Sequence, residues 1–269
     1  MATGKYHFSP KGIHLPMAIS IKGILYRTLS IENYLRILQR SYFFLYRTGF
    51  LKRNPIYKYH YYVKNLIQPG DTIIDIGANL GYYSMLFSKW TGPYGRVYAV
   101  EPVSLYNKIF KELSRNRTNI TLYPYALGPE NKKITIVDPL TGSQNDPYLK
   151  TGLLHVYDKE KDGELSAHKY RFESEMRKPE SLFAELKKID YIKCDVEGFE
   201  LEVLTQMKSL ILKHKPIVQS EIAGENRGAI KDMFTELGYS AFCLEGNELK
   251  LQTGPLPIHE TDFIFKPDR

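Results

Sequence analysis

The sequence has little cysteine and tryptophan, and it has no long apolar run. Its 269 residues include two cysteines, Cys194 and Cys243, and one tryptophan. The cysteines show neither a CxxC nor a Cys/His spacing, so we expect core thiols in a reducing compartment, not a redox motif or zinc site. A membrane span needs about 20 apolar residues. The apolar run at 13–21 is short, holds a proline and precedes Lys22, which disfavours a signal peptide. We expect a cytoplasmic protein.

Acidic residues are almost absent from the first 60 residues, which hold ten basic side chains and one acidic one, Glu32. This segment carries a balance of +9, against −2 for the remaining 209 residues. Aromatic residues recur there at helical intervals, which predicts a helical N-terminal extension over residues 1–66. It is either a solvated cap or a surface for a phosphate-bearing or membrane-linked substrate. Nothing resembles a nucleic-acid-binding module, so we expect no nucleic-acid partner.

The most informative stretch is residues 72–84, an isoleucine-rich run followed by a turn with two glycines and the start of a helix. The run predicts a strand buried on both faces, and Gly77 and Gly81 allow a tight turn close to a ligand. Asp75 lies near the carboxyl end of the strand, where α/β sheets bind ligands. A carboxylate there suits a ligand with positive charge and hydroxyls better than one that carries only phosphates.

A second acid, Glu101, follows the next predicted strand at 96–100. Pro102 ends that strand, so the position of the carboxylate is fixed. Glu101 lies 20 residues beyond Gly81, the place from which a carboxylate binds both hydroxyls of a ribose. The alternative is that it only caps the following helix. A third strand is predicted over 120–127, and Ala126 near its end is expected close to a base.

The region from 131 to 177 is the least regular, and it contains a polar loop at 138–147. Such a loop within a βα series is more often functional than accidental, so we predict a substrate-side insertion around 138–178. Four of its residues are candidate substrate groups, although each alone also has a structural explanation: Asn145, Asp146, His155 and His168.

Two further acids, Asp195 and Glu197, follow a predicted strand at 189–194. Glu200 and Glu202 come just after them, but these two complement the dipole of the predicted helix at 199–212. Asp195 and Glu197 have no such explanation. Two carboxylates at one strand end repel each other unless a cation, a base role or a hydrogen-bond donor compensates. We therefore expect both to be functional.

The last third of the chain completes a doubly wound α/β fold. It contains a strand at 216–222 with Glu221 at its end, a helix at 227–237, and two late strands without a helix between them, which indicates antiparallel pairing. This predicts a seven-stranded, Rossmann-like class I methyltransferase sheet over 67–269, with the last pair antiparallel. A dinucleotide-binding fold would keep alternating strands and helices.

The sequence resembles the FkbM family of S-adenosylmethionine-dependent O-methyltransferases in three ordered blocks, at 75–84, 100–102 and 189–200. The resemblance covers roughly 65–245. It implies methylation of hydroxyls on sugars, glycolipids or polyketides, with Asp75 facing the ammonium end of the cofactor. The residues expected to bind S-adenosylmethionine are Asp75, Gly77, Ala78, Asn79, Gly81, Tyr82, Glu101, Pro102, Ala126 and Asp195.

An alcohol is a poor nucleophile at neutral pH, so methyl transfer to a hydroxyl calls for a base or a divalent cation. Asp195 is the first candidate for the base, followed by Glu197 and His155. Alternatively, Asp195, Glu197 and Glu221 share a Mg²⁺ ion.

Two other functions stay open at this point. One is a non-catalytic S-adenosylmethionine-binding protein on the same fold. The other is a nicotinamide-dependent oxidoreductase, which would want a third glycine and would tolerate Asp75 poorly. The acceptor, the oligomeric state and a metal requirement do not follow from the sequence.

Overall fold

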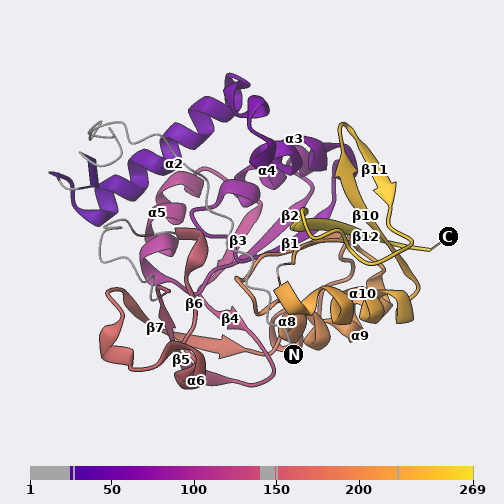
Figure 1. Cartoon of the computed structure of the whole chain (residues 1–269). Helices are drawn as coiled ribbons and strands as arrows, with labels where there is room; N and C mark the ends of the chain where they lie inside the picture. The colour runs from indigo at the N-terminus through magenta and orange to yellow at the C-terminus, as the bar shows by residue number, and fades with distance from the viewer. Residues whose placement is uncertain (1–24, 27, 140–148, 150, 223, 269) are drawn as a thin grey trace, which may run out of the picture.

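The structure is a computed structural model, and it describes residues 25–26, 28–139, 149, 151–222 and 224–268 (Figure 1). Asn145 and Asp146, two of the predicted substrate groups, lie outside the described residues. Within the described ranges, no helix is both long and apolar enough to cross a bilayer.

The centre of the molecule is one mostly parallel sheet with the order β11-β10-β12-β9-β8-β1-β2-β3. Its strands are β1 (Thr72–Ile76), β2 (Arg96–Val100), β3 (Ile120–Tyr123), β8 (Tyr191–Cys194), β9 (Ile217–Glu221), β10 (Tyr239–Glu245), β11 (Glu248–Leu251) and β12 (Asp262–Pro267). Strand β1 pairs in parallel with β2 and β8, and β12 pairs antiparallel with β9 and β10. The predicted doubly wound α/β fold and antiparallel last pair are confirmed.

The sheet has eight strands within the described residues, so the predicted number of seven is wrong. The additional strand, β11, pairs antiparallel with β10, and Glu245 lies opposite Glu248. The two residues between them include Gly246, at φ 62°. A two-residue turn with positive φ is the usual connection of a hairpin.

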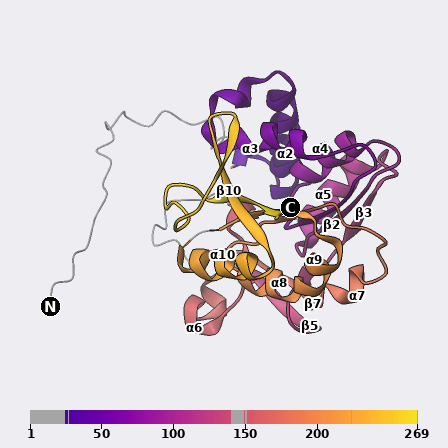
Figure 2. The same ribbon diagram turned by 90° about the vertical axis from the view of Figure 1, so that its right-hand side faces the viewer.

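Helices cover both faces of the sheet (Figures 1 and 2). They are α2 (Ile31–Arg47), α3 (Lys58–Tyr62), α4 (Tyr82–Thr91), α5 (Ser104–Ser114), α6 (Lys159–Asp162), α7 (Glu180–Phe183), α8 (Glu200–Gln206), α9 (Lys208–His214) and α10 (Arg227–Glu236). The side chains of β1 point alternately to the two faces of the sheet, as they do in any strand. Ile73 packs in one core with Phe87 of α4, and Ile74 packs in another with Leu204 of α8.

The described part of the N-terminal segment is helical and packs directly on the sheet. Besides α2 and α3 it contains three short 3₁₀ helices: η1 (Phe50–Arg53), η2 (Pro55–Tyr57) and η3 (Val63–Leu66). Lys58 forms an ion pair with Glu260 at 2.6 Å, and the Tyr59 hydroxyl donates to the Asp262 carbonyl oxygen at 2.7 Å. These contacts join the segment to the C-terminal strands. A domain boundary at residue 66 stays a prediction.

The predicted insertion contributes two strands, β6 and β7, to a second sheet with the order β4-β7-β5-β6. Its strands are β4 (Ala126–Leu127), β5 (Lys132–Val137), β6 (His155–Val156) and β7 (Arg171–Arg177). The single strand predicted over 120–127 is therefore wrong. Pro124 lacks an N–H group and has a fixed φ, so it separates β3 from β4.

The helix predicted at 199–212 also divides, into α8 and α9. The break is at Met207, whose amide donates at 3.1 Å to the carbonyl oxygens of both Val203 and Leu204. Between β7 and β8 the chain forms one short α-helix, α7 (Glu180–Phe183).

The turn after β1 has no room for a side chain. A Cβ atom on Gly77, at φ +78°, would lie 1.8 Å from the Asp195 carbonyl oxygen. We therefore expect Gly77→Ala to lower the free energy of unfolding by about 3 kcal/mol or more, measured by urea denaturation.

Gly238→Ala is the matched control for this substitution. Gly238 also has a positive φ of +73°, but nothing lies within 4 Å of its added Cβ. Only the cost of the left-handed backbone applies there, about 1 to 2 kcal/mol. Equal losses in the two variants would contradict the close contact at Gly77.

Candidate active site

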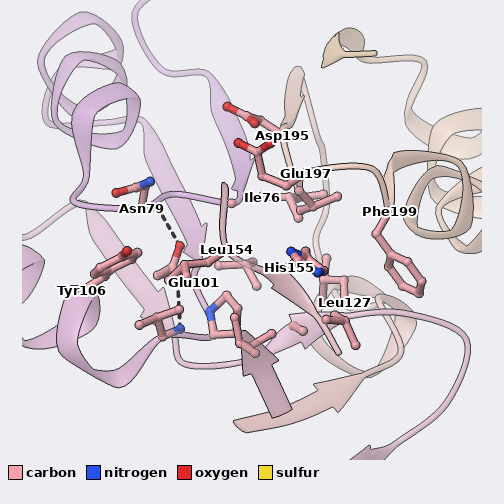
Figure 3. Close-up of a pocket in the computed structure, with 18 of the residues that line it drawn as sticks. Ile76, Asn79, Glu101, Tyr106, Leu127, Leu154, His155, Asp195, Glu197 and Phe199 are labelled. Atoms are coloured by element: carbon pink, nitrogen blue, oxygen red, sulfur yellow. Dashed lines mark hydrogen bonds between the residues drawn. The ribbon is translucent and has the colours of Figure 1, made fainter. Parts of the chain in front are cut away.

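A first cavity lies where β1, β2 and β8 end, and the insertion closes its other side (Figure 3). Its lining includes these residues predicted from the sequence: Gly77, Asn79, Glu101, Pro102, Ala126, His155, Asp195 and Glu197. Its volume of about 100 Å³ is below the roughly 300 Å³ at which small-molecule pockets begin. Thr151, Gly152 and Leu154 of the insertion belong to the wall that encloses it.

Asn79, in the turn after β1, forms hydrogen bonds to residues on both sides of this cavity, Glu101 and Thr151. Its backbone is left-handed, at φ 51°, and its amide N–H donates to Glu101 Oε2 at 2.8 Å. Its Oδ1 accepts from the Leu80 amide at 2.7 Å, and its Nδ2 donates to the Thr151 carbonyl oxygen at 2.9 Å. The side chain therefore links the sheet to the insertion.

Glu101 is held at the end of β2 with only 4% of its surface exposed. Its Oε2 accepts from Asn79, and its Oε1 accepts from the Val103 amide at 2.8 Å. Burial raises the pKa of Glu101 to about 7, although the two backbone donors oppose this. Each oxygen retains a second lone pair, so the carboxylate can still accept bonds from two ligand hydroxyls.

Tyr106 of α5 is a lining residue that the sequence analysis missed. It is 1% exposed, and among the described residues its hydroxyl has no hydrogen-bond partner. Burial raises the pKa of this hydroxyl, with a smaller contribution from Glu101. A buried hydroxyl without a partner is costly, so it marks a place for a ligand acceptor. In the sequence, Tyr106 looks like any aromatic residue of an amphipathic helix.

Lys193 is a buried cation in the middle of β8. It is 3% exposed, its Nζ donates to Asp195 Oδ2 at 2.7 Å, and it lies 4.7 Å from the centre of the Tyr83 ring. Burial lowers the pKa of Lys193, but Asp195 and Asp75 together outweigh burial and leave the pKa raised. The lysine therefore stays charged. Its position in an apolar strand was the sequence signal that could have identified it.

Asp75 lies beside Lys193 in the sheet and not in the cavity wall. The two residues are partners in the β1–β8 register, and Asp75 Oδ2 accepts from the Ser84 hydroxyl. Asp75 is fully buried, and Oδ1 has no partner in the described part of the chain. Burial raises the pKa of Asp75. Contact between Asp75 and the ammonium end of the cofactor stays a prediction.

Ala78, Gly81 and Tyr82 also lie behind the wall of the first cavity. Ala78 packs in a small core with Phe110, and a Cβ on Gly81 would lie 2.4 Å from that ring. The Tyr82 ring packs at 4.5 Å from the ring of Tyr42. These residues fix the turn and the start of α4.

Glu197 lies beside Asp195 at one end of the first cavity (Figure 3). Its backbone is left-handed, at φ 53°. Burial raises its pKa to about 8, with a further contribution from Asp195. Glu200 Oε1 accepts from the amides of Val196 and Gly198 at 3.1 and 3.0 Å, which shapes this loop.

The two predicted histidines of the insertion both contact Asp162. His155 lines the first cavity, and its Nε2 lies 2.9 Å from Asp162 Oδ1, while its Nδ1 lies 3.3 Å from the Leu153 carbonyl oxygen. His168 is 2% exposed and bonds the carbonyl oxygens of Asp138 and Asp162. His168 therefore holds the insertion together, away from the cavity.

A second cavity of about 330 Å³ adjoins the first, and Asp195 lines both. The sequence analysis singled out only Asp195 and Glu221 among its lining residues. The others come from the N-terminal segment, α4, β8 and the chain before β12: Pro55, Ile56, Lys58, Tyr59, His60, Tyr83, Lys193, His259, Glu260, Thr261 and Asp262.

This second cavity has more carboxylates than cations to pair with them. Lys58 pairs with Glu260 and Lys193 with Asp195, which leaves Glu221 and Asp262 without a cation among the described residues. Burial raises the pKa of Glu221 to about 8 and that of Asp262 to about 6. Both carboxyls therefore favour ligands that donate hydrogen bonds or carry positive charge.

His60 adds no charge to the second cavity. Burial and the neighbouring Lys193 lower its pKa to about 3, so its ring is neutral at physiological pH. It stacks on Tyr83 at 4.2 Å between ring centres, and its Nδ1 lies 2.5 Å from the Tyr42 hydroxyl.

The described residues contain no group of three or more His, Cys, Asp or Glu side chains that could hold a metal ion. A Mg²⁺ ion shared by Asp195, Glu197 and Glu221 stays a prediction. Glu197 lines the first cavity and Glu221 the second, while Asp195 lines both.

The sequence profile of the methyltransferase FkbM domain matches residues 75–241. The chain belongs to the FkbM methyltransferase family. The matched region begins at Asp75, near the end of β1, and includes β2, β8 and Asp195, so it covers the strand ends that form the first cavity. The predicted family and methyltransferase activity are confirmed. No curated protein sequence matches the chain.

Several solved methyltransferase structures are similar to the chain at low identity. The FkbM methyltransferase of Methylobacillus flagellatus is 14% identical, with 91% of this chain and 57% of that one covered and a TM-score of 0.48. Fibrillarin of Aeropyrum pernix, with natively bound S-adenosyl-L-methionine, is 13% identical over 75% and 68%, with a TM-score of 0.45. Precorrin-6y C5,15-methyltransferase of Geobacter metallireducens is 12% identical over 79% and 87%, with a TM-score of 0.44. The family assignment rests on the sequence profile.

The raised pKa of Glu197 predicts a pH dependence of stability. In the folded chain this carboxyl keeps its proton from its ordinary value of 4.5 up to about 8, whereas the unfolded chain releases it. The folded state then binds more protons, so stability falls as the pH rises through this window. Glu197→Gln removes this contribution, so urea denaturation across the window should show a shallower decline. An unchanged slope would contradict the raised pKa.

Proposed function

We propose that this chain is an O-methyltransferase that transfers the methyl group of S-adenosylmethionine to a hydroxyl of a sugar, glycan or glycolipid. The observation that carries the proposal is the position of Asp195, which lines both cavities. The first cavity then holds the methyl donor and the second holds the acceptor. A cytoplasmic location stays a prediction.

The residues of the first cavity fit S-adenosylmethionine. Glu101 retains two acceptor sites for the ribose hydroxyls, and the Tyr106 hydroxyl is a donor that has no partner among the described residues. Leu127 and Phe199 provide an apolar lining suited to a base. When bound, S-adenosylmethionine supplies a methyl group activated by its sulfonium. In this proposal the Asn79–Thr151 contact in the cavity wall opens as the cofactor enters, because the cavity is small.

The second cavity fits a polyhydroxylated acceptor. Its volume of about 330 Å³ lies at the lower end of the range for small-molecule pockets, roughly 300–1,000 Å³. Glu221 and Asp262 accept hydrogen bonds from hydroxyls, and the Asp262 carboxylate, which has no cation partner among the described residues, disfavours an anionic group inside the cavity. A phosphate carried by the acceptor therefore stays outside the cavity.

Asp195 acts as the base in this proposal. Its Oδ2 is held by Lys193 at 2.7 Å, which leaves Oδ1 to accept the proton of the acceptor hydroxyl. The hydroxyl oxygen bonds to the methyl carbon as the carbon–sulfur bond breaks, and the proton moves to Asp195. Alignment of the two reactants supplies most of the rate enhancement, and the base contributes about 10²- to 10⁴-fold. Lys193 positions Asp195 for this step.

Mass spectrometry tests the proposal directly. The purified chain is incubated with S-adenosylmethionine and a panel of sugars, amino sugars, nucleotide-sugars and lipid-linked glycans. We expect a neutral or cationic sugar to gain one methyl group while nucleotide-sugars stay unmodified. Binding of S-adenosylmethionine without turnover on any member of the panel would favour the non-catalytic alternative. The nicotinamide alternative is disfavoured by the family, and titration with NAD checks it.

Asp195→Asn should abolish methyl transfer and leave the affinity for S-adenosylmethionine within several-fold, because it removes the base but keeps the shape of the side chain. Turnover and isothermal titration measure the two quantities. Glu202→Gln is the control, since Glu202 is an exposed carboxylate of α8 outside both cavities. A fully active Asp195→Asn variant would overturn the assignment.

Glu221→Gln separates the acceptor cavity from the cofactor cavity. Glu221 lines only the second one. We expect the KM for the acceptor to rise severalfold, up to about tenfold, the loss expected for one hydrogen bond. The Kd for S-adenosylmethionine should stay unchanged. A change confined to cofactor binding would contradict the proposed division of the two cavities.

A further inference from the structure

The surface around the C-terminal end of α2 combines exposed apolar side chains with basic ones. Phe44, Phe50 and Ile56 are 67%, 58% and 75% exposed. They lie on α2, η1 and η2, which follow one another along the chain and contact each other. Exposed basic residues accompany them, and we call the whole set the docking patch: Arg40, Phe44, Arg47, Phe50, Lys52, Arg53 and Ile56.

The outer stripe of α2 is distinct from the face that packs on the protein. Arg40, Phe44 and Arg47 are spaced by four and three residues, so they share one side of the helix. All three are exposed, whereas Leu35 and Tyr42 on the inner side are buried. The docking patch is therefore not a poorly covered part of the core. Figure 1 shows α2 at the outer edge of the molecule.

The charge of the docking patch is strongly one-sided. Residues 33–70 contain seven Lys and Arg residues and no Asp or Glu. Two of the seven form ion pairs within the chain: Arg36 with Glu32 and Glu112, and Lys58 with Glu260. Among the described residues, Arg47, Lys52 and Arg53 have no carboxylate partner.

We propose that the docking patch binds the surface of a membrane that contains anionic lipids. Basic side chains attract anionic headgroups, and exposed Phe and Ile side chains insert at the boundary of headgroups and acyl chains. A nucleic acid would also satisfy the basic residues, but an aliphatic side chain such as Ile56 offers its bases no stacking surface. Ile56 also lines the second cavity, so a chain bound in this way has that cavity beside the membrane surface.

Sedimentation with vesicles tests the proposal without any need for activity. The full chain is mixed with vesicles of phosphatidylcholine alone, or of phosphatidylcholine with phosphatidylglycerol. We expect binding only to the second kind, and weaker binding at higher ionic strength because salt screens surface charges. Binding that needs no anionic lipid, or no binding to either vesicle, would overturn the proposal.

Two variants separate the two components of the docking patch. Arg47→Gln/Lys52→Gln/Arg53→Gln should reduce partitioning about 10- to 100-fold, since each cation near an anionic surface contributes. Phe44→Ser/Phe50→Ser should reduce it about tenfold or more through lost apolar insertion. Circular dichroism and thermal unfolding verify that both variants fold, and both leave the residues of the two cavities unchanged.

Matched controls alter equally exposed residues elsewhere. Tyr94 and Leu212 are 90% and 52% exposed, and Tyr94→Ser/Leu212→Ser should bind vesicles like the unaltered chain. The same holds for Lys89→Gln/Lys161→Gln/Lys187→Gln, which removes three exposed cations outside the docking patch. Equal losses in patch and control variants would overturn the proposal. It would also be overturned if an oligonucleotide displaced the chain from vesicles while the Phe44→Ser/Phe50→Ser variant still bound vesicles like the unaltered chain.

Discussion

The buried ammonium of Lys193 holds together the polar part of the sheet at which the two cavities meet. It pairs with Asp195 at 2.7 Å, and the strand register puts Asp75 beside it. Without that cation, two carboxylates would be buried close together, at a cost of several kcal/mol. Because Lys193 is fixed in the middle of β8, Asp195 is fixed as well. The placement of the reacting groups therefore depends on a strand and not on a loop.

The sequence was sufficient for the parts of the site that depend on local signals. The isoleucine-rich run and Gly77 predict β1 and its turn, and Pro102 places Glu101 at the end of β2. These features require only strand periodicity, the conformational freedom of glycine and the fixed φ of proline. Asp195 was identified because no local structural role explained it. These residues of β1, β2 and β8 all lie within or next to the region that the family profile matches, residues 75–241.

Long-range contacts are what the sequence could not supply. The second cavity forms because residues 55–60 lie close to residues 259–262, and no local sequence pattern predicts that contact. In the sequence Tyr106 looks like a core residue, and only the structure shows that its hydroxyl has no partner within the described ranges. The sequence also did not show that Asp75 lies beside the buried Lys193 in the sheet. The second sheet was missed because its strands are short and partly polar.

The ion pair between Lys58 and Glu260 joins residues separated by 202 positions. During synthesis, the strands around the first cavity emerge well before the last strand, β12, which inserts between β9 and β10. The second cavity is therefore incomplete until residues 259–262 have been synthesised, because they form one of its walls. Contacts of such high sequence separation form slowly in folding. A nascent chain would thus acquire the elements of its first cavity before it could enclose an acceptor, and loss of residues 259–268 would uncouple the two.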